Sequence, residues 1–144
     1  MSEIRTLTAL DYEKIINLWA EAGLPYKPQG RDSKEMLTKE MLLPQTVFLG
    51  IDDGSDKMIA MGIANFDGRR GWINRVAVDP DWRGQNLAGQ IIDACEKFLY
   101  KQGAVVICAL IEDINYPSIS TFQKNGYTCE QTIKYFTKRN SQDA

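Results

Sequence analysis

The chain has 144 residues, of which 44% are hydrophobic and 25% charged, so it is long enough to bury the core of one domain spanning residues 1–144. Its net charge of −2 and pI near 5.2 argue against general affinity for nucleic acid or anionic membranes and favour a small-molecule or protein partner. Three cysteines and no histidine make neither a disulfide framework nor a metal cluster, so we expect no bound metal and a reducing, cytoplasmic location.

The start of the chain carries no leader pattern. Its acidic residues Met1-Ser2-Glu3 lack the basic and apolar regions of a signal peptide. No apolar run approaches the roughly 20 residues that cross a membrane. We therefore expect neither export nor membrane insertion.

The first third of the chain reads as one short strand followed by two helices. Residues 4–7 alternate like a strand. Thr8 and Asp11 form a capping box, which predicts a helix over residues 8–22. The buried stripe of this helix is predicted to consist of Ile15, Leu18, Trp19 and Ala22.

A loop over residues 24–31 separates the two helices and is longer than the usual connection. Loops of this length often carry functional residues. Asp32 or Ser33 caps the second helix, and Pro44 stops it after Leu43.

The middle of the chain predicts three antiparallel strands. Polar turns that contain glycine join them. The predicted strands cover residues 46–51, 58–66 and 72–78.

The second half of the chain begins with a helix over residues 86–102, whose apolar side chains recur at helical spacing. Cys95 belongs to that set and is predicted to be a core residue rather than a nucleophile. Residues 104–111 are almost wholly apolar, which predicts a strand buried on both faces. Residues 127–128 and 133–136 read as a closing hairpin, followed by a frayed tail.

The turn between the third middle strand and the helix after it has the composition of an anion-binding loop. Asp79-Pro80-Asp81 ends the strand, and the small residues Gly84, Ala88 and Gly89 let a ligand approach the backbone. The first free N–H groups of the helix converge there, which suits an anion such as a pyrophosphate. An ordinary strand-to-helix turn capped by Asn86 is the competing interpretation.

This segment resembles the acetyl-coenzyme A (acetyl-CoA) binding motif of the Gcn5-related N-acetyltransferase (GNAT) family, Arg/Gln-x-x-Gly-x-Gly/Ala. Arg83 and Ala88 match, and Asn86 replaces the middle glycine while tolerating the same positive φ. Residues 115–127 resemble the second GNAT signature, Asn-x-x-Ala-x-x-x-Tyr-x-x-x-Gly-Phe/Tyr. The resemblance covers residues 73–127.

The resemblance implies an α/β (α+β) fold: a mixed, mostly antiparallel central sheet of six to seven strands with helices on both faces. In that fold the strand ending at Val78 and the strand ending near Ile111 splay apart, and coenzyme A enters the gap.

The resemblance also implies which segments hold acetyl-CoA. The strand backbone would pair with the pantetheine amides, the loop N–H groups would hold the pyrophosphate, and the second signature would meet the pantetheine. The predicted cofactor-binding residues are Val76, Ala77, Val78, Arg83, Gly84, Gln85, Asn86, Leu87, Ala88, Gly89, Asn115, Ser118 and Phe122.

The implied chemistry is acyl transfer from a thioester to an amine, which needs a neutral amine, a polarised carbonyl and a proton for the departing thiolate. A backbone N–H near Val78 would polarise the carbonyl. Phe122 stands where the family usually has a proton-donating Tyr. Tyr116, Ser118, Tyr127 or water remain alternatives, as does unassisted departure of a thiolate whose pKa is about 8.5.

The proton acceptor for the amine is predicted to be Glu112, at the end of the apolar strand. Alternation places Asn74 on the same face as Val76 and Val78, where it would order a water for Glu112. Asp113 and solvent are the competing bases.

The acceptor site is implied to lie beside the loop between the first two helices, as in GNAT relatives. Tyr26, Lys27 and Arg31 are therefore predicted to contact the substrate, with a solvated loop as the competing interpretation. The predicted function is acetyl transfer from acetyl-CoA to a primary amine of a small molecule or protein. A catalytically weak acyl-CoA-binding module is the alternative. The identity of the amine and the presence of a homodimer are left open.

Overall fold

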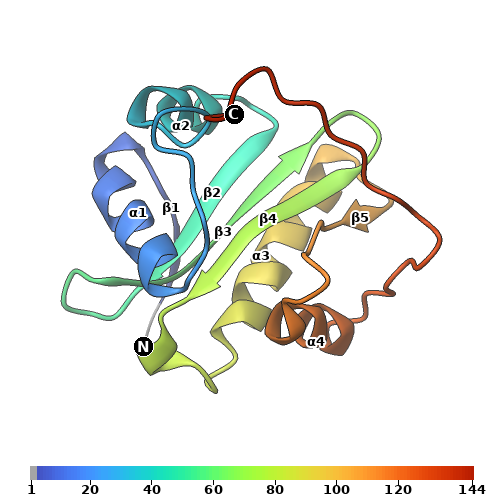
Figure 1. The fold of residues 1–144 in the computed structure, drawn as a ribbon. Helices are drawn as coiled ribbons and strands as arrows, with labels where there is room; N and C mark the ends of the chain where they lie inside the picture. The colour runs from blue at the N-terminus through green and yellow to red at the C-terminus, as the bar shows by residue number, and fades with distance from the viewer. Residues whose placement is uncertain (1–2) are drawn as a thin grey trace.

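The computed structural model describes residues 3–144, so Met1 and Ser2 of the acidic start lie outside the described residues. Its sheet has the order β1-β2-β3-β4-β5 (Figure 1). The first four strands pair antiparallel, and β5 joins β4 in parallel. The strands are β1 (Ile4–Thr6), β2 (Thr46–Asp52), β3 (Met58–Phe66), β4 (Gly71–Val78) and β5 (Ile107–Cys108).

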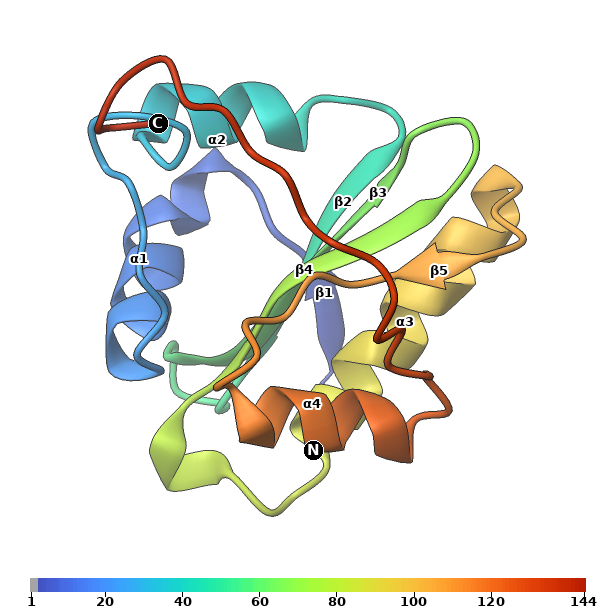
Figure 2. The same ribbon diagram turned by 45° about the vertical axis from the view of Figure 1, so that its right-hand side comes forward.

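Helices cover both faces of the sheet, with α1 and α2 on one face and α3 and α4 on the other (Figures 1 and 2). Each face has its own cluster of buried apolar side chains. No helix in the described part of the chain is long and apolar enough to span a bilayer. The helices are α1 (Tyr12–Glu21), α2 (Lys34–Met41), α3 (Leu87–Gln102) and α4 (Tyr116–Lys124), with 3₁₀ turns at Ala9–Asp11 and Pro80–Trp82.

Local sequence signals account for the start of the chain. The predicted capping box is confirmed, because the Thr8 side chain accepts a backbone hydrogen bond and Asp11 Oδ2 accepts one from the Thr8 N–H at 2.9 Å. Of the two predicted caps for α2, Ser33 holds the position, and its Oγ accepts from the Met36 N–H at 3.2 Å. The predicted stripe of α1 is buried except for Ala22, which is half-buried.

The predicted long strand over residues 104–111 is wrong, since β5 contains only Ile107 and Cys108. The expectation that it is buried on both faces is also wrong, because Val105 is 89% and Leu110 is 55% exposed. The reason is that no strand follows β5 at the edge of the sheet, so one side of this apolar run stays uncovered.

The predicted closing hairpin is wrong as well, so the sheet formed by residues 3–144 has five strands instead of the expected six to seven. Residues 128–144, called here the C-terminal segment, form no helix or strand and cross from α4 to α2 (Figures 1 and 2). The end of the segment is not frayed: the Gln142 carbonyl accepts a hydrogen bond from Lys27 Nζ at 3.2 Å. A Cβ at Gly30 would collide with the Asp143 carbonyl, which shows how closely the segment approaches the loop before α2.

Candidate active site

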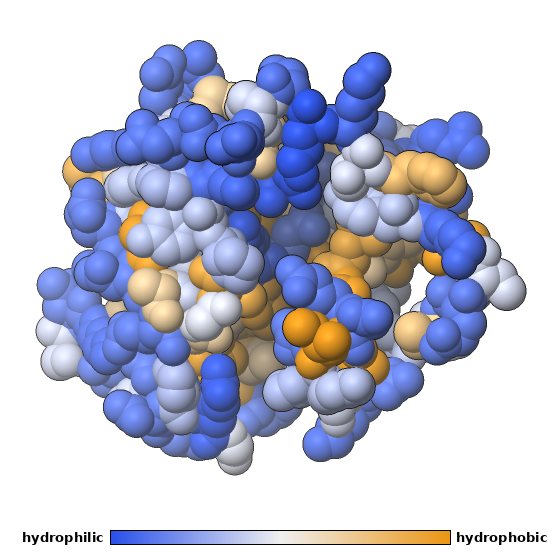
Figure 3. Space-filling model, viewed as in Figure 1, coloured by the Kyte–Doolittle hydropathy of each residue, from blue (hydrophilic) through white to orange (hydrophobic). Residues whose placement is uncertain are grey.

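A cleft of about 810 Å³ opens where β4 and β5 separate. The two strands pair only at Gly71 with Ile107 and at Trp72 with Cys108. Beyond these pairs the outer edge of β4 has no neighbouring strand among the described residues. The cleft therefore lies outside the carboxyl ends of two parallel strands, the usual ligand position in such sheets. Figure 3 shows a hollow in this face with hydrophobic side chains on its walls.

A β-bulge in β4 shapes the floor of the cleft. Arg75 and Val76 together lie opposite Gly62, and Arg75 adopts a φ of 57°. The bulge interrupts the alternation of the strand, so Val76 and Val78 pack toward α3 while Asn74 pairs with Ile63 on the α1 face. The prediction that Asn74 shares a face with Val76 and Val78 is therefore wrong.

The Arg75 side chain joins the bulge to the loop before α2. Its guanidinium lies 4.6 Å from the Trp19 ring centroid, and Nη1 donates to the Pro25 carbonyl at 2.6 Å. Nη2 donates to Asp32 Oδ2 at 3.4 Å. Burial lowers the pKa of Arg75, and the charge of Asp32 opposes that shift. Arg75 and the residues it contacts, Trp19, Pro25 and Asp32, all line the cleft.

The loop between β4 and α3 presents unpaired backbone donors. Gly84 and Asn86 have positive φ values of 86° and 59°, as predicted for Asn86, but its side chain makes no capping hydrogen bond. Within residues 3–144, no protein acceptor is found for the N–H groups of residues 83–89. The first turn of α3 contains no acidic residue. These N–H groups and the helix dipole can therefore receive an anion.

Asp79 anchors the entrance to this loop and is 1% exposed. Its carboxylate forms an ion pair with Lys57 Nζ at 2.9 Å and accepts from the Asp81 N–H at 2.9 Å. Lys57, and next the Asp81 N–H, lower the pKa of Asp79. Because a lowered carboxyl pKa stabilises the folded state only while the group is ionised, this contribution is present above about pH 4 and is lost in more acidic solution.

Asp79→Asn should lower the Tm at pH 7, because the amide leaves Lys57 without its buried partner. It should also weaken the acid dependence, so that the Tm falls less between pH 5 and about pH 2 than in the unsubstituted protein. Thermal unfolding followed by circular dichroism across this range measures both effects. Parallel Tm curves for the two proteins would contradict the assigned role of Asp79.

Helix α4 forms another wall of the cleft. Asn115 caps it, accepting from the Ser118 N–H at 3.3 Å, and both residues line the cleft. Phe122 lines the cleft and is 6% exposed, with its ring edge-to-face against Tyr127 at 5.0 Å between centroids. Tyr127 itself donates its hydroxyl to Glu96 at 2.6 Å and does not line the cleft. Burial, and next this hydrogen bond, raise the pKa of Tyr127.

Of the hydroxyl groups considered at sequence level, Ser118 therefore lines the cleft, whereas Tyr127 and the 71% exposed Tyr116 do not. No cysteine lines it either. Cys95 is fully buried in the core, and burial raises the pKa of its thiol to about 12. A covalent step through a cysteine nucleophile thus has no support in this cleft.

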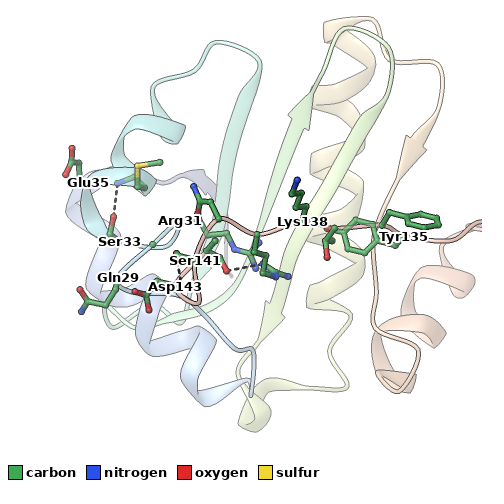
Figure 4. Close-up of a pocket in the computed structure, with 15 residues that line it drawn as sticks. Gln29, Arg31, Ser33, Glu35, Tyr135, Lys138, Ser141 and Asp143 are labelled. Carbon is green, nitrogen blue, oxygen red and sulfur yellow. Dashed lines mark hydrogen bonds between the residues drawn. The ribbon is translucent and has the colours of Figure 1, made fainter.

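The structure brings the predicted catalytic and substrate residues to one cleft. Glu112 and Asn74 line it, and Asp113 does not. Tyr26, Lys27 and Arg31 line the opposite side. A second hollow of about 910 Å³ adjoins the cleft between the loop and the C-terminal segment, as Figure 4 shows.

Sequence reasoning missed four charged residues that line the cleft: Asp32, Glu40, Arg75 and Arg139. The one available signal was Arg75, a charged residue inside an otherwise apolar strand. Asp32 was considered only as a helix cap. Nothing in the local sequence distinguishes Glu40 or Arg139 from ordinary surface residues.

The sequence of this chain is similar to those of known acetyltransferases. The family model described as "Acetyltransferase (GNAT) family" matches residues 12–127. An acetyltransferase of Sodalis glossinidius is 27% identical over 143 residues, which cover 98% of this chain and 97% of that protein.

The solved structures that are similar in fold include two N-acetyltransferases. The PaiA N-acetyltransferase of Thermoplasma acidophilum in complex with coenzyme A superposes with a TM-score of 0.80 at 22% identity, covering 92% of this chain and 93% of that one. The aminoglycoside antibiotic 6′-N-acetyltransferase AAC(6′)-Ih of Acinetobacter baumannii has a TM-score of 0.80 at 13% identity, covering 98% and 100%.

Proposed function

The chain belongs to the GNAT family of acetyl-CoA-dependent N-acetyltransferases, and we propose that its acceptor is a primary amine, on a small molecule or a protein, that enters the cleft beside the loop before α2. The observation that carries this proposal is that two features follow each other directly along the chain beside the cleft. One is the set of free N–H groups at the start of α3, and the other is the open edge of β4.

The residues of the cleft and of the loop before α3 fit acetyl-CoA. N–H groups of residues 83–89 would hold the pyrophosphate, with Arg83 as a nearby cation. The free edge of β4 from Val76 to Val78 would pair with the pantetheine amides, and Asn115 and Ser118 would contact the same arm. When bound, acetyl-CoA supplies an activated acetyl thioester.

The chain's own residues then supply binding, polarisation and proton transfer. A backbone N–H at the end of β4 would polarise the thioester carbonyl of bound acetyl-CoA. Glu112 takes the proton of the incoming amine, directly or through a water held by Asn74. As the amide C–N bond forms and the thioester C–S bond breaks, Ser118 or a water would protonate the departing thiolate. With a thiol pKa of about 8.5, the thiolate is also a tolerable leaving group without protonation.

The experiment that tests this proposal measures thiol release from acetyl-CoA in the presence of a panel of polyamines, aminoglycosides, amino acids and peptides. We expect release above background with at least one amine, together with a higher Tm in the presence of coenzyme A. A protein that is stabilised by the cofactor yet releases no thiol with any amine would be an acyl-CoA-binding module.

Phe122→Tyr tests the register of the second signature. Because Phe122 lines the cleft, the added hydroxyl should reach it, leaving the Tm nearly unchanged and the rate of thiol release unchanged or increased. Phe122→Leu serves as the control for packing and should lower the Tm, since it removes the aromatic contact with Tyr127. A severely destabilised Phe122→Tyr protein with unaltered cofactor binding would make Phe122 a plain core residue.

A further inference from the structure

The charged side chains of the cleft are not equally free to meet a substrate. Asp32 is 5% exposed and accepts hydrogen bonds from the Lys27 N–H at 2.8 Å and from Arg75 Nη2 at 3.4 Å. The Arg75 guanidinium also donates a hydrogen bond to the Pro25 carbonyl and lies over the Trp19 ring. The Asp32–Arg75 pair is therefore internal to the protein and offers an incoming molecule little net charge.

Three other cations line the same end of the cleft: Lys27, Arg31 and Arg139. Among residues 3–144 no Asp or Glu side chain forms an ion pair with any of them. Lys27 Nζ donates once, to the Gln142 carbonyl, and Arg139 donates once, to the Ala144 backbone oxygen at 3.0 Å. Since an ammonium has three donors and a guanidinium five, most of their donors remain available.

The three cations come from two chain segments that meet over this end of the cleft. Lys27 and Arg31 belong to the loop before α2, and Arg139 belongs to the C-terminal segment. Figure 4 shows Arg31 in the adjoining hollow between these two segments. A group bound here would therefore be held from both sides.

Two further acidic side chains line the cleft, Glu40 and Glu112, whereas Glu35 and Asp143 line the adjoining hollow and not the cleft. Glu40, on α2, is half-buried, and burial, followed by the charge of Asp32, raises its pKa. Glu112 lies after β5, beyond the end of the sheet. A carboxylate or phosphate is the natural partner of a site with unpaired guanidinium and ammonium donors.

We infer that the amine acceptor also carries an anionic group, a carboxylate or a phosphate, which Lys27, Arg31 and Arg139 bind while the amine faces Glu112. The inference rests on the proposed function, because it places the anionic group relative to an amine that is acetylated in this cleft. It selects amines with an anionic substituent over polycationic amines.

The test compares amines that differ only in the anionic group: lysine with cadaverine, a peptide with its C-terminal amide, and an amino sugar with its 6-phosphate. Each is titrated calorimetrically into the protein in the presence of free coenzyme A. In at least one pair the anionic member should bind about 10- to 100-fold more tightly, the range of a charge-assisted hydrogen-bonded pair. The pair that shows the preference distinguishes carboxylate from phosphate.

Arg31→Gln and Arg139→Gln should each reduce that preference about 10-fold without weakening the binding of the member that lacks the anionic group. Lys134→Gln is the matched control, because Lys134 lies on the same segment as Arg139 but lines neither the cleft nor the adjoining hollow. It should leave the preference intact. The coenzyme A-induced rise in Tm verifies that each variant is folded.

Three results would overturn the inference: no anionic member binds, spermidine or an aminoglycoside binds more tightly than every anionic amine, or Lys134→Gln acts as strongly as Arg31→Gln. Thiol release separates this inference from the proposed function. Anionic amines that bind without thiol release would retain the anion site and refute acetyl transfer. Thiol release with a preference for polycations would support acetyl transfer and refute the anion site.

Discussion

Replacing Glu112 with glutamine should lower kcat/KM by about 10²- to 10⁴-fold at neutral pH, the range that general base catalysis usually contributes. Glutamine keeps the shape of the side chain but cannot accept the proton of an ammonium acceptor. The loss should shrink as the pH rises toward the pKa of an alkyl amine, about 10, because more of the amine then arrives neutral. The measurement is the pH profile of kcat/KM for thiol release, with coenzyme A affinity as the check on folding.

Asp113→Asn is the control for Glu112→Gln, since the neighbouring carboxylate does not line the cleft. It should retain full activity. If Asp113→Asn is the impaired variant instead, the base has been assigned to the wrong carboxylate. A loss in Glu112→Gln that persists equally at high pH would indicate impaired acceptor binding. Full activity in both variants would indicate that solvent deprotonates the acceptor amine and that the protein catalyses the reaction chiefly by positioning the two substrates.

Ala88→Glu and Gly84→Pro should each abolish the rise in Tm that coenzyme A produces. The glutamate places a carboxylate among the N–H groups that would receive the pyrophosphate, so the two anions repel each other. Proline removes one loop N–H and cannot adopt the φ of 86° that Gly84 has. Thermal unfolding with and without coenzyme A measures both variants.

Gln102→Glu introduces the same charge at the opposite end of α3 and serves as the control for Ala88→Glu. It should keep the coenzyme A-induced shift. An unchanged shift in a folded Ala88→Glu protein would place the cofactor somewhere other than this loop. Gly84→Pro alone is less decisive, because a distorted loop and a lost hydrogen bond give the same result.

The parts of the fold that sequence predicted well are those that local chemistry determines. The Thr8–Asp11 capping box, the glycine turns between the middle strands and the antiparallel pairing of β2, β3 and β4 each follow from residues close together in the chain. The positive φ of Asn86 was predictable for the same reason.

The bulge at Arg75 was not predictable, because arginine carries no preference for positive φ and its conformation depends on distant contacts with Trp19 and Asp32. One inserted residue was enough to reverse the face assigned to Asn74. Glu112 reached the cleft independently of that error, since it follows β5 rather than β4.

The prediction of a closing hairpin in the C-terminal segment was wrong for a different reason. Ile133 and Tyr135 alternate with polar residues as a strand would, yet they are 74% and 69% exposed. A strand also needs an edge to pair with, and β5 ends after two residues at Cys108. Pairing across the sheet is a tertiary property that a period of two cannot reveal, and Arg139 was missed with it.

The central claim is that this cleft transfers an acetyl group to an amine, and transfer of a labelled acetyl group tests it most directly. Acetyl-CoA labelled with ¹³C at the carbonyl is incubated with the protein and the amine that gives the fastest thiol release, and NMR follows the label. We expect the label to appear as an amide on the amine in an amount equal to the free thiol. Label that stays on coenzyme A while the cofactor raises the Tm, or that appears only as acetate, would contradict the claim.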